Sequence, residues 1–271
     1  MQAAIKGRNP HRLLCVDSGA EQILEFAPDG TVETTVPTIG AAFEVWRLGN
    51  TYLYPHLGRE HHGACLVNAD GRILREYRTD SEVFTCQPTA DGGVLIGELT
   101  SKRLIWLAED WSVRAAIPIR SAVSGHEVMR MARQQPDGSF LVVHPGDCCI
   151  RQYTPTGNLL REVPTRPDTF AAHNLPNGHL VYTAQTTIIE VDTAGHVVWE
   201  ADADDLAAIA PRWLTGLEVL PDGSYVVCNW LGHGCEGQGA PLFGINRQKE
   251  ILWQLYAPEF TRNIANVKVL P

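Results

Sequence analysis

The chain has 271 residues, of which 44% are hydrophobic and 20% charged, values typical of a folded globular protein and not of a disordered chain. Its formal net charge is −9 and no basic stripe is present, which argues against nucleic-acid or acidic-membrane binding. No apolar run reaches the ~18 residues of a membrane span. The first ten residues also lack the apolar core of a signal peptide, so we expect a cytoplasmic protein, although a chain whose signal peptide has been removed would read the same.

The seven cysteines do not suggest a disulfide framework, because their number is odd and they are scattered over strand-like segments. We expect reduced thiols in the core. The adjacent pair Cys148 and Cys149 is the exception, and its role is left open.

Two kinds of turn alternate along the chain, each followed by a strand with alternating apolar and polar residues. Copies of the first turn end at Gly30, Gly71, Trp111, Gly157, Gly195 and Lys249. Copies of the second occupy residues 49–50, 90–93, 136–139, 176–179 and 221–224. Alternation bounded by Gly, Asp and Pro is the signal of antiparallel hairpins. One unit therefore holds four strands in roughly 45 residues, the size of a propeller blade.

The second turn has one copy fewer than the first, and the missing copy falls where the chain ends meet. Residues 263–270 match the first strand of a blade, and residues 11–17 match the second. We therefore predict an all-β fold, a six-bladed β-propeller of four-stranded antiparallel blades in a single domain over 1–271. The C-terminal strand would join the N-terminal blade and remove a free edge. A two-sheet sandwich is the alternative, but it does not explain the regular unit with permuted ends.

Two segments, DTAGHVVWEA and NRQKEILWQL, carry Trp199 and Trp253 at equivalent positions. They resemble the repeats of PQQ-like, or quinoprotein-type, propellers. The segment from Leu217 to Trp253 is also similar to a block found in small single-domain proteins of that type. The resemblance implies the propeller fold and no function. We expect no quinone, because quinoprotein dehydrogenases are larger and have eight blades.

In a propeller, the loops that follow the second strand of each blade surround the mouth of the central channel. When the six second strands are aligned by their turns, five of the six positions at the strand end are polar, the sixth being Ala184. The five are Asp17, His56, Glu98, His144 and Asn229. We expect these side chains to converge as exposed groups at the mouth, where six of the ten histidines also fall.

The mouth-facing segments supply candidates for each chemical role. As acid–base groups we choose His126, Glu127 and Glu98, with Arg130 to hold a substrate anion or an enolate-like charge. As substrate-binding groups we choose Asp17, Arg59, His233, Asn229 and Trp230. His56 and His144 are the first choices as ligands of a divalent metal, Zn, Mn or Fe, because they are anchored on strands. His61 and His62 read equally well as solvated loop residues.

These residues favour an enzyme that acts on a polar small molecule, such as a carbohydrate or glycoside derivative. Its chemistry would be that of a lyase or hydrolase using His and carboxylate groups, with or without metal assistance. The oligogalacturonate and streptogramin lyases are similar in placing histidines and a metal at such a mouth. The alternative is a non-catalytic propeller that binds a protein or a small ligand. Motifs such as HExxH, CxxC and GxSxG are absent, and the oligomeric state is left open.

Overall fold

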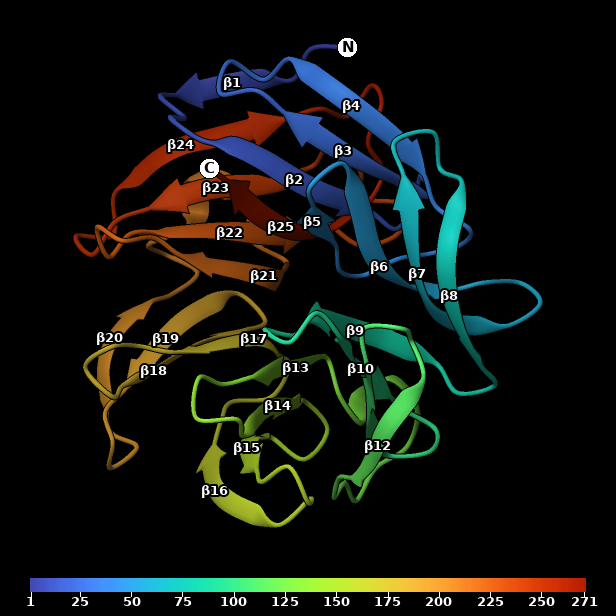
Figure 1. Ribbon diagram of the computed structural model, residues 1–271. Helices are drawn as coiled ribbons and strands as arrows, with labels where there is room; N and C mark the ends of the chain where they lie inside the picture. Colours follow the sequence, from blue (N-terminus) through green and yellow to red (C-terminus); the bar gives the residue numbers. More distant parts are fainter. The chain divides into compact units, whose positions relative to one another are not determined.

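The computed structural model describes residues 1–271, which form β-strands with two single-turn 3-10 helices, η1 (Gly125–Glu127) and η2 (Ala207–Ile209) (Figure 1). The strands form six antiparallel sheets. The fold class is therefore the all-β, six-bladed β-propeller that the turn repeats predict. None of the helices has the length and hydrophobicity that a membrane span requires.

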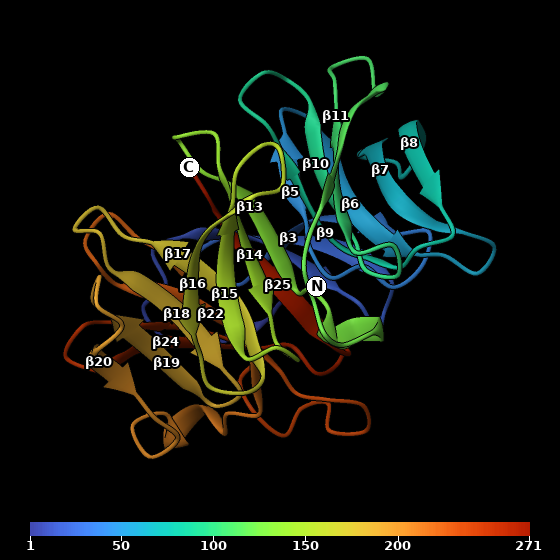
Figure 2. The ribbon, with the colours of Figure 1, turned by 90° about the horizontal axis from the view of Figure 1, so that it is seen from below.

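The chain divides into two compact parts. The part from Thr38 to Phe170 holds three four-stranded sheets. The first is β5 (Trp46–Leu48), β6 (Thr51–Leu57), β7 (His62–Asn68) and β8 (Ile73–Thr79). The second is β9 (Val83–Pro88), β10 (Val94–Glu98), β11 (Arg103–Leu107) and β12 (Val113–Pro118). The third is β13 (Met131–Gln134), β14 (Phe140–His144), β15 (Cys149–Tyr153) and β16 (Leu159–Pro164), whose strands lie side by side in Figure 2.

The other part comprises Met1–Pro37 and Ala171–Pro271. One sheet is β25 (Ile264–Leu270), β2 (Arg12–Asp17), β3 (Gln22–Phe26) and β4 (Val32–Pro37). The next is β17 (Thr169–Asn174), which begins in the first part, with β18 (Leu180–Ala184), β19 (Thr187–Val191) and β20 (Val197–Ala201). The last is β21 (Trp213–Val219), β22 (Tyr225–Trp230), β23 (Leu242–Ile245) and β24 (Ile251–Tyr256), joined by β1 (Ala4–Gly7). The expectation of a single domain over 1–271 stays a prediction.

Burial explains why each second strand reads as a nearly continuous apolar run. Every residue of β10 is buried, because both faces of this middle strand are covered by neighbouring sheets. One apolar cluster joins the β5–β8 and β9–β12 sheets through Leu53, Val83 and Ile105. Another joins the β9–β12 and β13–β16 sheets through Phe84 and Val142. The outer strands keep one exposed face.

The closure of the N-terminal sheet is confirmed. Strand β25 pairs with β2 from Arg12 opposite Leu270 to Asp17 opposite Ile264. The red C-terminal strand and the blue β2 lie side by side in Figure 1. Strand β1 was not predicted: it pairs with β24, with Ala4 opposite Tyr256. The N-terminus therefore extends the outer edge of a second sheet.

Candidate functional site

The five polar residues at the ends of the second strands are buried, with no exposed surface at any of them. The expectation of exposed side chains is wrong. The polar atoms of most of these residues form hydrogen bonds with other segments of the protein and do not face solvent. Asp17 accepts hydrogen bonds from the backbone N–H groups of Asn263 (2.8 Å) and Gly19 (3.1 Å). The side-chain oxygen of Asn229, Oδ1, accepts one from the backbone N–H of Arg212 at 2.8 Å. These residues hold loops that would otherwise leave backbone donors unpaired.

Glu98 is held by three donors. Its oxygens accept hydrogen bonds from Tyr77 Oη at 2.7 Å, Ser101 Oγ at 2.5 Å and Arg103 Nε at 2.5 Å. Burial would raise its pKa, but the hydrogen bonds from Arg103, Ser101 and Tyr77 outweigh burial and lower the pKa below its usual value. A carboxylate with this many donors is a weak proton acceptor. Glu98 therefore joins β8, β10 and β11.

His144 is fully buried, and both of its ring nitrogens have partners. Nδ1 lies 2.6 Å from the Val128 carbonyl oxygen and therefore donates to it, while Nε2 lies 3.2 Å from the Tyr153 hydroxyl. Burial lowers the pKa of His144 to about 4. At neutral pH this histidine is an uncharged link between Val128, which directly follows η1, and Tyr153 on β15. A metal at His144 would have to displace one of these two bonds.

His56 occupies the equivalent strand end and differs from His144 in its contacts. It is also fully buried, but neither ring nitrogen has a hydrogen-bond partner. Its Nε2 lies 3.7 Å from Glu76 Oε1, which His61 Nε2 approaches to 2.6 Å. The possible ligand atoms of these three residues all lie within 4.8 Å of one another. Burial lowers the pKa of His56 to about 4, against the opposing charge of Glu76.

The strand register produces this cluster. His56 pairs with Gly63 across β6 and β7, and Gly63 pairs with Arg78 across β7 and β8. Glu76 lies two residues before Arg78, so its side chain projects from the same face. A Cβ on Gly63 would lie 3.3 Å from His56 Nε2, so the glycine leaves the space over which His56 and Glu76 approach. The sequence did not predict Glu76, because this residue lies on the outer strand β8 and not at a second-strand end or in a mouth loop.

His126 lies on η1 and is half exposed. Its Nε2 is 2.9 Å from Glu82 Oε1, so the second ring nitrogen, Nδ1, faces away from this ion pair. The imidazole also meets the Phe84 ring edge-on, with 4.8 Å between the ring centroids. The sequence predicted His126 as an acid–base group but did not identify Glu82 as its partner.

Arg130 contacts the same phenylalanine. Its guanidinium lies 4.8 Å from the centroid of Phe84 and 5.4 Å from that of Phe170. Nε is buried without a hydrogen-bond partner. Burial lowers the pKa of Arg130, and the charges of Glu127 and Glu82 partly oppose the shift. The structure thus places Arg130 and His126 around one aromatic ring, with the exposed Glu127 on η1 beside them.

The remaining predicted substrate-binding residues are spread over both parts of the chain. Arg59 is exposed in the loop after β6. Trp230 and His233 stack edge to face at 5.3 Å, and Trp230 Nε1 is buried without a partner. With Asp17 and Asn229, they belong to the part that holds both chain ends. Roles for these five residues stay predictions.

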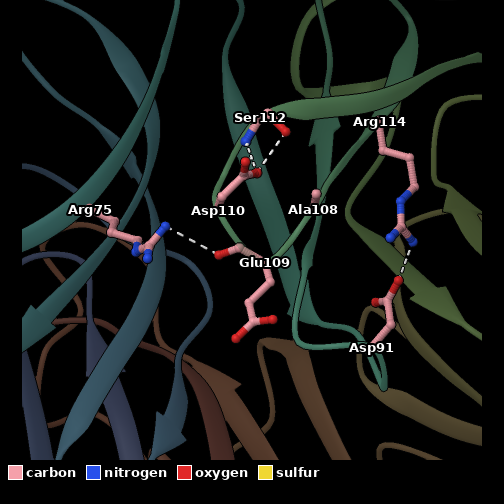
Figure 3. A pocket seen from close by; sticks show the side chains of 7 residues that line it. All are labelled: Arg75, Asp91, Ala108, Glu109, Asp110, Ser112 and Arg114. Carbon is pink, nitrogen blue, oxygen red and sulfur yellow. Dashed lines mark hydrogen bonds and ion pairs between the residues drawn. The ribbon is translucent and has the colours of Figure 1, made fainter.

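A cavity of about 450 Å³ lies by the turns before β10 and β12 (Figure 3). Among its charged groups, Arg114 forms an ion pair with Asp91, and Arg75 donates to the backbone carbonyl of Glu109 at 3.2 Å. Its lining residues include no histidine. We therefore place the candidate site at His126 and Arg130.

Searches of protein-family models and of curated proteins find no match. A protein of unknown function from Bacteroides caccae is similar in structure, with TM-score 0.83 and 20% identity over 95% of this chain and 98% of that one. A streptogramin B lyase has TM-score 0.61 and 16% identity over 94% and 82% of the two chains. A virginiamycin B lyase from Staphylococcus aureus has TM-score 0.61 and 12% identity over 94% and 87%. At these identities the likeness shows the shared fold alone.

Proposed function

We propose that the chain is an enzyme of the lyase or hydrolase type that acts on a small polar molecule with a carboxylate or carbonyl group. The observation that carries the proposal is the arrangement around Phe84, where the His126–Glu82 pair and the Arg130 guanidinium, with its unpartnered Nε, meet at one ring. An imidazole that is paired with a carboxylate thus shares one aromatic ring with a guanidinium that has no direct ion pair. This combination suits acid–base chemistry on an anionic substrate.

The chemistry follows from these positions. His126 Nδ1 takes a proton from the carbon next to the substrate carboxylate, and Glu82 stabilises the imidazolium that forms. Arg130 binds the carboxylate and stabilises the negative charge that develops on it. The electron pair then forms a carbon–carbon double bond as the neighbouring carbon–oxygen bond breaks. The leaving oxygen takes up a proton from His126 or Glu127.

A lyase of this kind fits a carbohydrate or glycoside derivative that carries a carboxylate. In such a substrate, the carbon attached to the carboxylate carries a hydrogen, and the adjacent carbon carries the oxygen that leaves. The names of two structurally similar proteins, streptogramin B lyase and virginiamycin B lyase, support the use of this fold for lyase chemistry. A hydrolase would use the same residues to activate water.

The test is a panel of uronate-containing glycosides, followed by the ultraviolet absorbance of the unsaturated product. We expect turnover by the natural protein and a loss of about 10²–10⁴-fold in His126→Gln, the range usual for a general base. The matched control is His196→Gln, because His196 is also an exposed histidine beside a carboxylate, that of Asp192. Ligand binding without turnover would instead identify a binding module, and equal activity of the two variants would refute the assignment of His126.

A further inference from the structure

The unpaired His56 marks a second site on the β5–β8 sheet. A buried imidazole without a hydrogen bond destabilises the fold, because it has left water and gained no polar partner. His144, at the aligned strand end, shows the usual arrangement, with both ring nitrogens bonded. His56 instead has Glu76 Oε1 at 3.7 Å and the edge of the His61 ring beside it. These neighbours carry electron pairs that could bind an ion, but neither forms a hydrogen bond with the His56 ring.

We propose that His56, His61 and Glu76 bind a divalent transition metal ion, with Zn²⁺ as the natural probe. Two imidazoles and one carboxylate form a donor set that zinc uses in proteins, and three protein ligands leave a fourth position for water or a substrate atom. Zinc bonds to N and O of ~2.0–2.2 Å place tetrahedral ligand atoms roughly 3.4 Å apart. The three donor atoms already lie within 4.8 Å of one another, so small side-chain rotations complete the set.

The surrounding residues suit an ion at this position. Glu76 Oε2 accepts a hydrogen bond from Arg78 Nε at 2.7 Å, which holds the carboxylate while Oε1 faces the histidines. Gly58 and Gly63 flank the His56 ring: a Cβ on either would lie 3.2 Å from Nδ1 or 3.3 Å from Nε2. These two glycines therefore place no side chain against either ring nitrogen of His56.

The site is also open to solvent on one side. The His61 side chain is 25% exposed, Glu76 is 10% exposed and His56 is fully buried. An ion would enter past His61 and bind against His56. The bond between His61 Nε2 and Glu76 Oε1 occupies the entrance, and the ion would replace the proton shared between them.

The test measures metal binding and not turnover, so it is independent of the proposed enzyme activity. Metal-free protein is titrated with Co²⁺, followed by visible absorbance, and then with competing Zn²⁺, with stoichiometry from elemental analysis. We expect one ion per chain in the natural protein and a loss of affinity of more than about tenfold in His61→Gln and in Glu76→Gln. Arg78→Ala should weaken binding by about 10–100-fold, as loss of a ligand-orienting partner does.

The chosen variants alter partly exposed side chains, so they avoid disrupting the core around His56. His62→Gln is the matched control, because alternation along β7 places His62 on the opposite face from Gly63 and His56. His126→Gln should also bind the ion normally, which separates this site from the proposed catalytic residues. Absence of stoichiometric binding in the natural protein, equal affinity in Glu76→Gln, or an equal loss in His62→Gln would each overturn the proposal.

Discussion

Replacing His144 with leucine should destabilise the protein at neutral pH and do so less in acid. At pH 7, His144→Leu removes the 2.6 Å bond to the Val128 carbonyl and leaves that buried oxygen unpaired. The Tyr153 hydroxyl retains contacts with the Arg120 backbone, so its loss is smaller. An unpaired buried acceptor costs about 1–3 kcal/mol, and we expect a decrease of that size in the free energy of unfolding.

The pH dependence follows from the lowered pKa. His144 titrates at about 4 in the folded protein and at ~6.5 in an unfolded chain. The unfolded chain therefore binds the proton more readily, so the contribution of neutral His144 is present above pH ~6.5 and is lost as the pH falls towards 4. A difference of 2–3 pKa units corresponds to about 3 kcal/mol. His144→Leu lacks this loss, so the stability gap should close in acid.

Urea denaturation of both proteins, followed by tryptophan fluorescence at several pH values between 7 and 4, measures this gap. Comparing the two proteins isolates His144, since the pKa of His56 is also about 4 and His56 is present in both. A gap that stays constant over this range would show that His144 is not held neutral by burial, and would refute the reasoning.

Three further outcomes are expected. Glu44→Gln should lower the free energy of unfolding by about 3–5 kcal/mol, because it leaves the buried Arg133 without its ion-pair partner; a urea transition unchanged in midpoint would contradict this. Deletion of residues 263–271 should abolish folding by removing β25, and a deletion mutant with an unaltered melting temperature would argue against the closure. A thiol reagent should modify only Cys148 and Cys235 in the native protein, because the other five cysteines are buried. Modification of a third thiol in the native protein would contradict this burial.

The fold was readable from the sequence because each blade repeats its turns at regular spacing. The closure by β25 was also predictable, since its apolar alternation matches that of other first strands. Strand β1 was missed because Ala4–Gly7 is short and lies at an outer edge, where no alternating pattern is required. Local pattern therefore identified the strands that are buried or that alternate, and it failed for one short edge strand without such a pattern.

The candidate sites were only partly predictable. The strand-end alignment found His56 and His144 but could not tell them apart, because their difference lies in contacts with Val128 and Glu76 from other segments. The pairing of Glu76 with His56 depends on register and on the missing side chain of Gly63. The residues that flank His56 or Glu76 in the sequence therefore do not predict this contact.

Proton exchange at the substrate carbon tests the proposed chemistry most directly. Small uronate glycosides are incubated with the protein in D₂O, and proton NMR follows the hydrogen on the carbon next to the carboxylate. Exchange of this hydrogen for deuterium requires its removal but not a completed elimination. We predict exchange or elimination with the natural protein, and loss of both in His126→Gln and in Arg130→Met. Exchange that persists unchanged in both variants, or that never occurs in the natural protein, would contradict the assignment of His126 as the base and Arg130 as the anion-binding group.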